Sequence, residues 1–275
     1  MTLKTLKSAV AVAGVAVAAI AAESCGKHSE VPIEFDTRVD SIGYMMPFID
    51  NDTVFAAAKY SVVWPERIGR DDDLGAMRDS LLAYTFGQPD AKDFSDAARR
   101  FMLDGVYSMR EEADSAFTHI KVPYDTANNA DNKNFAYVVS EVTLLTPNIL
   151  VIKIDNYQYS YGSAHGMQSE RFMNYSIADS KMLTADNIFK PGNEQAILDL
   201  INAQAKVSYP EEGALFAEPI KSLGSVQLEA DNVVFIYQPY DVAPYSTGIV
   251  RSPVNRYDLQ RFLSPETVRA LSQNE

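Results

Sequence analysis

The strongest constraint on the fold is a change of hydrophobic period after residue 134. Three consecutive segments then alternate apolar and polar side chains, as strands with one buried face do. They are Phe135–Leu145, Ile149–Tyr161 and Met167–Ile177. Short connections separate them, the first being Thr146-Pro147-Asn148, and short connections join antiparallel neighbours. The sequence therefore predicts an antiparallel β-meander here.

Helices and further strands surround this meander without regular alternation. Before it we expect a strand at Phe55–Trp64 ended by Pro65, a helix from Leu74 to Gly87, and a helix starting at Asp93 or Ser95. After it we expect a helix capped by Asn193, a hairpin of Val226–Leu228 and Val233–Tyr237, and a helix after Ser264-Pro265. This order predicts an α+β fold, an antiparallel β-meander packed with helices in one or two intimately joined subdomains.

The first 25 residues resemble a bacterial lipoprotein signal. Lys4 and Lys7 precede an uncharged stretch, Ser8–Ala22, which is shorter and richer in alanine than the roughly 20 apolar residues of a membrane span. The single cysteine, Cys25, follows directly, although Glu23 departs from the small residue usual at that step. The alternative is cleavage near Ala22 or Ser24, which would leave Cys25 as a free thiol.

We therefore expect a signal peptide at 1–24, an acylated Cys25 that anchors the chain to a membrane, and a tether at 25–40. An N-terminal α+β part at 41–134 and a C-terminal α+β domain at 135–275 would follow. The expected location is the cell envelope, as a periplasmic or outer-membrane lipoprotein.

Charge and motif content narrow the classes of partner. The formal net charge is −13, which argues against nucleic acid and favours cationic partners. No paired-histidine spacing, nucleophile elbow or phosphate-binding glycine loop occurs, and Cys25 is the only cysteine. We therefore predict no metal and no cofactor.

Two unusual segments supply the candidate ligand contacts. The first is Gly162-Ser163-Ala164-His165-Gly166, where a tight glycine connection or a binding loop is more plausible than a Ser163/His165 catalytic pair, since neighbouring side chains of one strand rarely give that geometry. The second is Tyr237–Gly248, rich in tyrosine and proline, which suits a recognition surface or a rigid crossing equally. The predicted contacts are Gly162, Ser163, His165, Gly166, Tyr240 and Tyr245.

The second strand of the meander has a change of phase. Ile152 and Ile154 lie on one face, whereas Tyr157, Tyr159 and Tyr161 lie on the other. Either a bulge near Asp155-Asn156 resets the register, or the tyrosines line a surface.

Several motifs, in this order, resemble the envelope domain of the anti-sigma factor RsiV and its relatives, a family largely of unknown function. They are the Gly-x-Ala-His-Gly turn at 162–166, Ser176–Thr184, Asp186–Phe189, Phe235-x-Tyr237, Pro239–Tyr245 with Gly248, and the helix at Tyr257. The resemblance covers about residues 135–265. It implies an α+β extracytoplasmic binding domain, which in RsiV recognises lysozyme, a strongly basic enzyme. The lipoprotein-like leader stands in place of a membrane-spanning helix and a sigma-binding segment, so only the sensing-type domain carries over.

The expected function is thus a non-enzymatic envelope lipoprotein that binds or senses a peptidoglycan-related ligand or a cationic muramidase. One alternative is an envelope hydrolase acting on glycan, with Glu141, Asp155 and Asp241 as the acids that would converge. Another is a structural component of an envelope complex.

Overall fold

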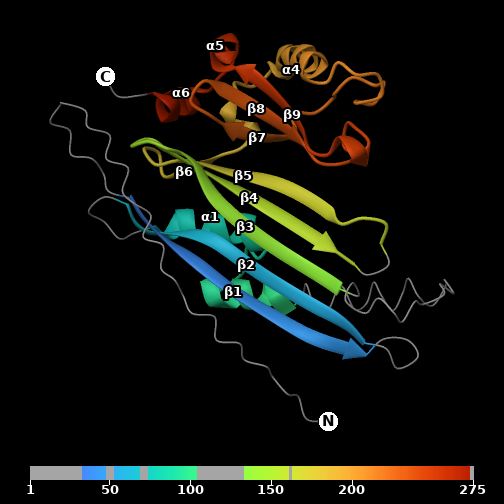
Figure 1. Ribbon diagram of the computed structural model, residues 1–275. Coiled ribbons are helices and arrows are strands. Elements are labelled where there is room, and N and C mark those ends of the chain that lie inside the picture. Colours follow the sequence, from blue (N-terminus) through green and yellow to red (C-terminus); the bar gives the residue numbers. More distant parts are fainter. Residues whose placement is uncertain (1–32, 48–52, 69–73, 104–132, 161–162, 273–275) are drawn as a thin grey trace.

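The computed structural model describes residues 33–47, 53–68, 74–103, 133–160 and 163–272 (Figure 1). Within this part the strands form a six-stranded sheet and a three-stranded sheet. Figure 1 shows the small sheet stacked at one end of the large one. The predicted α+β class is confirmed.

The large sheet has the strand order β1 to β6 along the chain. Its strands are β1 (Ile33–Pro47), β2 (Thr53–Ile68), β3 (Lys133–Leu145), β4 (Ile149–Tyr159), β5 (Met167–Ser176) and β6 (Lys181–Leu183). The small sheet contains β7 (Ser225–Leu228), β8 (Asn232–Tyr237) and β9 (Val250–Asn255). The helices are α1 (Gly75–Phe86), one at residues 94–103, α3 (Ala185–Ile188), α4 (Glu194–Ser208), the 3₁₀ turn η3 (Tyr245–Thr247), α5 (Arg256–Leu259) and α6 (Pro265–Leu271).

Neighbouring strands are antiparallel with one exception. β2 and β3 run parallel, from the pair Phe55–Lys133 to the pair Ser61–Val139. A parallel pair needs a long crossover rather than a hairpin, and the chain between β2 and β3 contains α1 and the helix at residues 94–103. The meander expected from the sequence therefore holds for β3, β4 and β5 but not for the step before them.

The tether expected at 25–40 is too long at its C-terminal end. β1 begins at Ile33 and pairs with β2 as far as Pro47, so residues 33–40 belong to the sheet. Charged residues at Glu34, Asp36 and Arg38 made this stretch resemble a solvated linker. Charges are also the usual composition of an edge strand, which they protect from pairing with other chains.

Pro65 does not end β2, contrary to expectation. The ladder between β2 and β3 stops at Ser61, and the register with β1 shifts between Glu34 and Phe35, opposite Pro65. A missing backbone donor costs little where the ladder is already interrupted. The strand consequently continues to Ile68.

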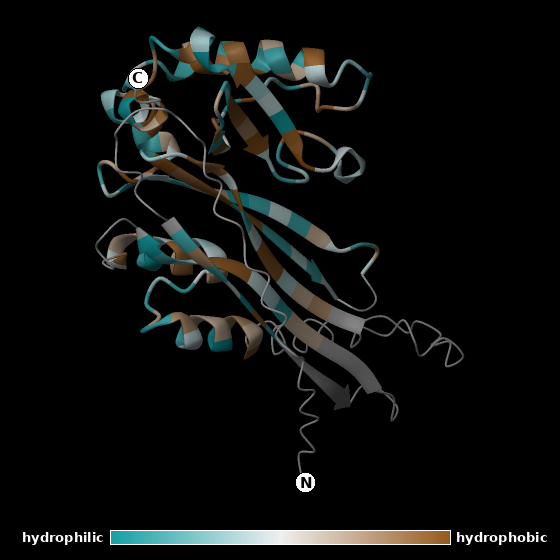
Figure 2. Cartoon of the chain, turned by 60° about the vertical axis from the view of Figure 1, so that its left-hand side comes forward, coloured by the Kyte–Doolittle hydropathy of each residue, from teal (hydrophilic) through white to brown (hydrophobic). Residues whose placement is uncertain are grey.

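The core lies on both faces of β4. Leu150, Ile152 and Ile154 are buried with side chains of α1 and of the helix at residues 94–103. Ile149 and Val151 are buried on the opposite face with the strands of the small sheet. Figure 2 shows hydrophobic residues gathered in the small sheet and mixed with hydrophilic ones along the large sheet. The first half of β4 is therefore sandwiched between two layers.

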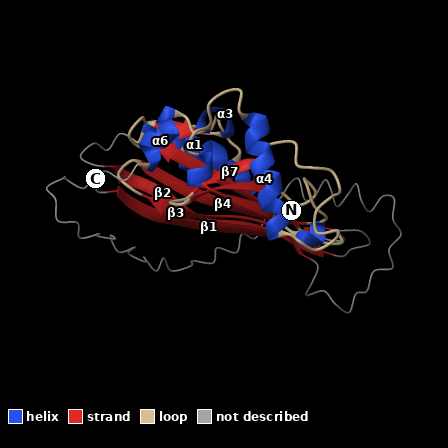
Figure 3. Cartoon of the chain, turned by 90° about the horizontal axis from the view of Figure 1, so that it is seen from above, coloured by secondary structure: helices blue, strands red, loops and turns tan. Residues whose placement is uncertain are grey.

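The helices form where apolar side chains recur at helical spacing. In α1 the buried residues Met77, Leu81 and Phe86 face the sheet, and Gly87 closes the helix with a left-handed φ of 66°. In α4 the buried residues are Ile197, Leu198, Ile201 and Ala205, as predicted. Figure 3 shows from above that α4 and α6 lie over the strands.

Side-chain amides join the two sheets. The buried Asn174 of β5 donates to the Val226 carbonyl over 2.7 Å and accepts from the Leu228 N–H over 2.9 Å. Gln238, directly after β8, accepts from the Glu170 N–H over 2.9 Å and donates to the Glu170 carbonyl over 2.8 Å. These bonds fix the segment after β8 against β5.

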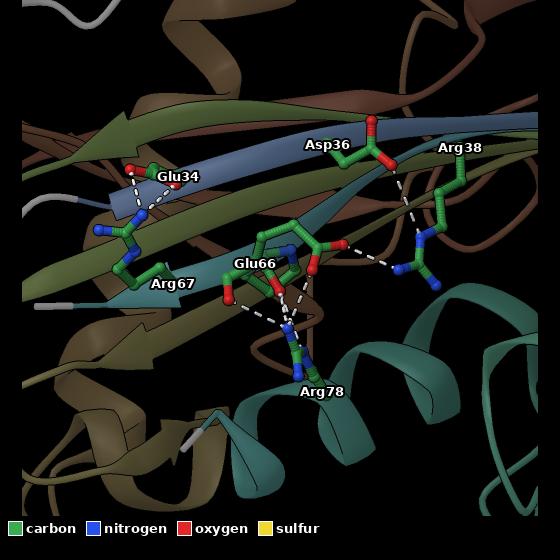
Figure 4. Close-up of polar contacts among 7 residues, drawn as sticks. Glu34, Asp36, Arg38, Glu66, Arg67 and Arg78 are labelled. Carbon is green, nitrogen blue, oxygen red and sulfur yellow. Dashed lines mark hydrogen bonds and ion pairs between the residues drawn. The ribbon is translucent and has the colours of Figure 1, made fainter. Parts of the chain in front are cut away.

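A polar cluster fastens α1 to the end of β2 (Figure 4). Arg78 donates to the Pro65 carbonyl over 2.8 Å and pairs with Glu66 over 3.4 Å. Arg38 of β1 pairs with the same Glu66 over 2.8 Å and lies 4.8 Å above the Trp64 ring. Every charge named here has a partner, so the cluster holds the helix layer in place.

Candidate functional site

The structure brings the two unusual segments into contact. The His165 ring stacks on Tyr245 with centroids 3.7 Å apart and planes inclined by 17°. The Tyr240 ring lies 5.7 Å from that of Tyr245. We call His165, Tyr240 and Tyr245 the aromatic patch. Its members come from a loop and a crossing 75 residues apart, and they touch rather than face each other across a cleft.

Hydrogen bonds set the orientation of each ring in the patch. The Tyr245 hydroxyl donates to the Gly166 carbonyl over 2.6 Å. The Nδ1 of His165 lies 3.1 Å from the same carbonyl, and its Nε2 lies 3.0 Å from the Tyr240 hydroxyl. A carbonyl only accepts, so Nδ1 carries a proton, and in the neutral ring Nε2 then accepts from the Tyr240 hydroxyl. Both ring nitrogens are thus engaged without Ser163.

Tyr240 holds a strained backbone conformation. The Asp241 N–H donates to the Gln238 carbonyl over 3.0 Å, which closes a turn with Pro239 second and Tyr240 third. The φ of Tyr240 is 75°, in the left-handed region that glycine normally occupies at this turn position. A left-handed residue other than glycine costs about 1–2 kcal/mol. The turn keeps a tyrosine there, and its side chain is 51% exposed; strain of this kind clusters at functional sites.

A stack of aromatic rings on β3 and β4 packs against the loop at Gly166. Tyr157 of β4 stacks between Phe135 and Tyr137 of β3, with each centroid distance 5.3 Å. A Cβ on Gly166 would lie 2.1 Å from the Tyr157 hydroxyl. Only glycine therefore allows the loop to sit this close to the stack.

The tyrosines of β4 line a half-buried surface. Of the two explanations for the change of hydrophobic phase in this strand, a bulge or a tyrosine-lined surface, the second therefore applies. The pairing of β4 with β3 and β5 is continuous through Asp155 and Asn156, and the register shift lies in β3 between Val142 and Leu144. Burial raises the pKa of Tyr157, and the nearby phenols of Tyr245, Tyr137 and Tyr159 raise it further.

A charged cluster lies farther along the same face of β4. The Lys153 amine is 2.9 Å from Asp155, 3.6 Å from Glu170 and 3.7 Å from Glu141. Glu170 also pairs closely with Arg251 of β9. Burial alone would lower the pKa of Lys153, but the Asp155 hydrogen bond and the charges of Glu170, Asp155 and Glu141 together raise it above its ordinary value.

The three acids of the hydrolase alternative do not form one group. Glu141 and Asp155 both lie within ion-pair distance of Lys153. Asp241 instead accepts from the Gln238 N–H over 2.8 Å, within its own turn. Two of the three acids are therefore engaged by one amine and the third by a backbone N–H, so the three do not converge.

Surface hollows occur elsewhere on the described part of the chain. One lies at α5 and α6 and includes Arg256, Tyr257 and Val268. Another lies at α3 and the start of α4 and includes Asp186, Lys190 and Gly224. Neither includes a residue of the aromatic patch. Among the described residues, no group of His, Cys, Asp and Glu has an arrangement suited to a metal ion.

Of the predicted contacts, the structure gathers His165, Gly166, Tyr240 and Tyr245. Ser163 is exposed on the same loop, and its N–H donates to the Ser160 carbonyl over 3.0 Å. Gly162 and Cys25 lie outside the described residues. The sequence analysis did not predict Lys153, Glu170 and Arg251 as members of the site. Gln238 lies in the predicted segment Tyr237–Gly248 but was not predicted as a contact.

The fold and the patch define the class: an α+β domain of two packed sheets with an aromatic surface at their junction. Residues 186–256 match the family described as "Protein of unknown function (DUF3298)". This match spans α3 to the start of α5 and includes Tyr240 and Tyr245.

Two solved structures share the fold. A DUF3298 family member from Bacteroides fragilis has 19% identity and a TM-score of 0.69, covering 90% of this chain and 100% of that one. A DUF3298 family protein from Pseudomonas aeruginosa has 16% identity and a TM-score of 0.57, covering 86% of this chain and 97% of that one. No curated protein matches the chain.

No helix in the described part of the chain has both the length and the apolar character needed to cross a membrane.

Proposed function

We propose that this chain is a binding module of a bacterial cell envelope, held at a membrane through an acylated Cys25, and that it recognises a ligand rather than transforming one. The observation that carries the proposal is the His165–Tyr245 stack with its hydrogen bond to Tyr240. Aromatic rings of fixed orientation bind at low entropic cost, because few rotamers are lost on association.

The strained turn supports recognition as the role of the patch. Tyr240 is half exposed in a conformation that disfavours any side chain, so folding alone does not account for a tyrosine there. The engaged nitrogens of His165 and the cation between Glu141 and Asp155 give no support to catalysis at these positions.

The proposed ligands are a peptidoglycan-related molecule or a cationic muramidase. The net charge of −13 favours encounter with a basic protein. The resemblance to the RsiV envelope domain points to the same pair of ligands, and the leader resemblance supports the location.

The test is binding of soluble peptidoglycan fragments and of hen egg-white lysozyme by the purified chain, at low and high salt. His165→Ala and Tyr240→Ala should each weaken binding about tenfold. Tyr257→Ala is the matched control, because Tyr257 is an 82% exposed tyrosine of α5 outside the patch. Equal binding by all three variants, or none by the wild type, would refute the proposal.

The proposed anchor has its own test. Labelled palmitate should enter the wild-type protein in cells, and Cys25→Ala should abolish the incorporation. Unlabelled wild-type protein recovered from the cytosol would disprove the location.

A further inference from the structure

The chemistry of the groups around the aromatic patch bears on the class of ligand, provided that the patch binds one as proposed above. Charged side chains near it are already satisfied within the protein. Asp241 accepts from the Gln238 N–H, and Glu170 pairs with Lys153 and Arg251. A charged ligand would have to compete with these contacts, whereas a neutral ligand leaves them intact.

Besides Asp241, which is exposed and bonded to the Gln238 N–H, three exposed side chains close to the rings carry uncharged hydrogen-bonding groups. Ser163 lies two residues before His165, and Ser246 follows Tyr245 directly; both are exposed. Gln168 is exposed as well, and its amide nitrogen lies 3.7 Å from where a Cβ on Gly248 would be. The Gly248 N–H in turn donates to the Tyr245 carbonyl over 2.9 Å. Hydroxyl and amide groups therefore flank the patch.

The Tyr240 ring, tilted by 31° to Tyr245 and by 35° to His165, supplies an exposed apolar face that does not need to reorganise. The Tyr240 hydroxyl donates to His165, so the half-exposed ring is fixed in place without being covered. His165 is itself fixed by Tyr245 and by the Gly166 carbonyl. A ligand that fits this surface needs one apolar face and polar groups at its rim.

We infer that the aromatic patch binds a neutral saccharide, with the C–H face of a pyranose ring on Tyr240 and the ring hydroxyl or acetamido groups towards Ser163, Gln168 and Ser246. An aromatic ring covers the apolar face of a sugar, and neutral donors and acceptors match its equatorial groups. A neutral glycan carries no charge of its own, so binding to this surface does not require a charge on the ligand to be desolvated.

The experiment compares two oligosaccharides of equal length, one with acetylated and one with free amino groups, titrated into the full chain by calorimetry. Chitotetraose is neutral, and its fully deacetylated counterpart is cationic. We expect chitotetraose to bind with little dependence on salt, since no ion pair forms, and the deacetylated tetramer to bind less tightly. Tyr240→Ala should weaken chitotetraose binding about tenfold, whereas Tyr257→Ala should not change it.

Hen egg-white lysozyme serves as a further probe that separates this inference from the proposed function. Binding of lysozyme or of the cationic tetramer alone, weakened by salt and by Tyr240→Ala, would overturn the saccharide inference and leave a binding module. Absence of chitotetraose binding at about 10 mM would overturn it as well. Chitotetraose binding that is equal in the wild type and Tyr240→Ala would place the sugar elsewhere and also overturn it.

Discussion

Gly166→Ala tests whether the loop after β4 is seated on the ring of Tyr157. The added Cβ would lie 2.1 Å from the Tyr157 hydroxyl oxygen and 2.2 Å from its Cζ. Non-bonded carbons in contact are about 3.5–4.0 Å apart. Either the ring or the loop therefore has to move by more than 1 Å, roughly the difference between these distances.

The two routes have similar costs. Moving the ring disrupts its stacking on Phe135 and Tyr137, and each aromatic pair contributes about 0.5–1.5 kcal/mol. Moving the loop breaks the bonds of Tyr245 and His165 to the Gly166 carbonyl, each worth about 0.5–1.5 kcal/mol net. Either way Gly166→Ala should lower the free energy of unfolding by about 1–3 kcal/mol, the usual range for overpacking.

A double-mutant cycle with urea unfolding isolates the clash. Tyr157→Ala removes the obstructing ring, so adding Gly166→Ala to that background should cost less than about 0.5 kcal/mol. The expected coupling energy is therefore about 1–3 kcal/mol. The same penalty for Gly166→Ala in both backgrounds would show that the ring is not what excludes a side chain at residue 166.

Three further predictions concern the turn and the charged cluster. The Tyr240→Gly variant should be about 1 kcal/mol more stable than Tyr240→Ala, because only Gly relieves the positive φ. At the helical Tyr257 the Ala variant should instead be the more stable one. Thermal melts of the four variants test both orders of stability. Glu170→Gln should lower the free energy of unfolding by about 1–2 kcal/mol by leaving Lys153 and Arg251 short of a counter-charge, the value being limited by the 39% exposure of Arg251; urea titrations showing no change would contradict this. The raised pKa of Lys153 means that its ion pairs stabilise the folded state at neutral pH and are lost as pH rises beyond about 10.5. The stability advantage of the wild type over Lys153→Met should therefore shrink in thermal melts above that pH. A difference in stability that stays constant with pH would refute the assignment.

Hydrophobic period was sufficient to predict most of the elements. β3 buries alternate residues, and α4 buries Ile197, Leu198, Ile201 and Ala205 at helical spacing. β4 and β5 also lie where the sequence predicts them, although the first half of β4 and the second half of β5 are buried on both faces. β1 could not be predicted in the same way, because its composition is that of a charged edge and its pairing with β2 is made by the backbone. The parallel pairing of β2 with β3 could not be predicted either, because it depends on where the chain re-enters the sheet after the intervening helices.

The candidate site likewise has one part that could be predicted from the sequence and one part that could not. Its aromatic part was predictable because each segment has an unusual local composition, and its members are close in sequence within a segment. The ion pairs of Glu170 with Lys153 and Arg251 join residues 17 and 81 positions apart, and a single sequence carries no signal for such pairings. The steric need for glycine at residue 166 likewise arises only when Tyr157 is placed beneath it.

The amides that join the two sheets offer a local probe of their separation. The N–H groups of Glu170 and Leu228 donate to the side chains of Gln238 and Asn174 rather than to a neighbouring strand. Their protection from deuterium exchange therefore depends on this junction and does not require either sheet to unfold. Exchange at these two positions, followed with and without a ligand, would report whether occupancy of the aromatic surface tightens the contact between the layers.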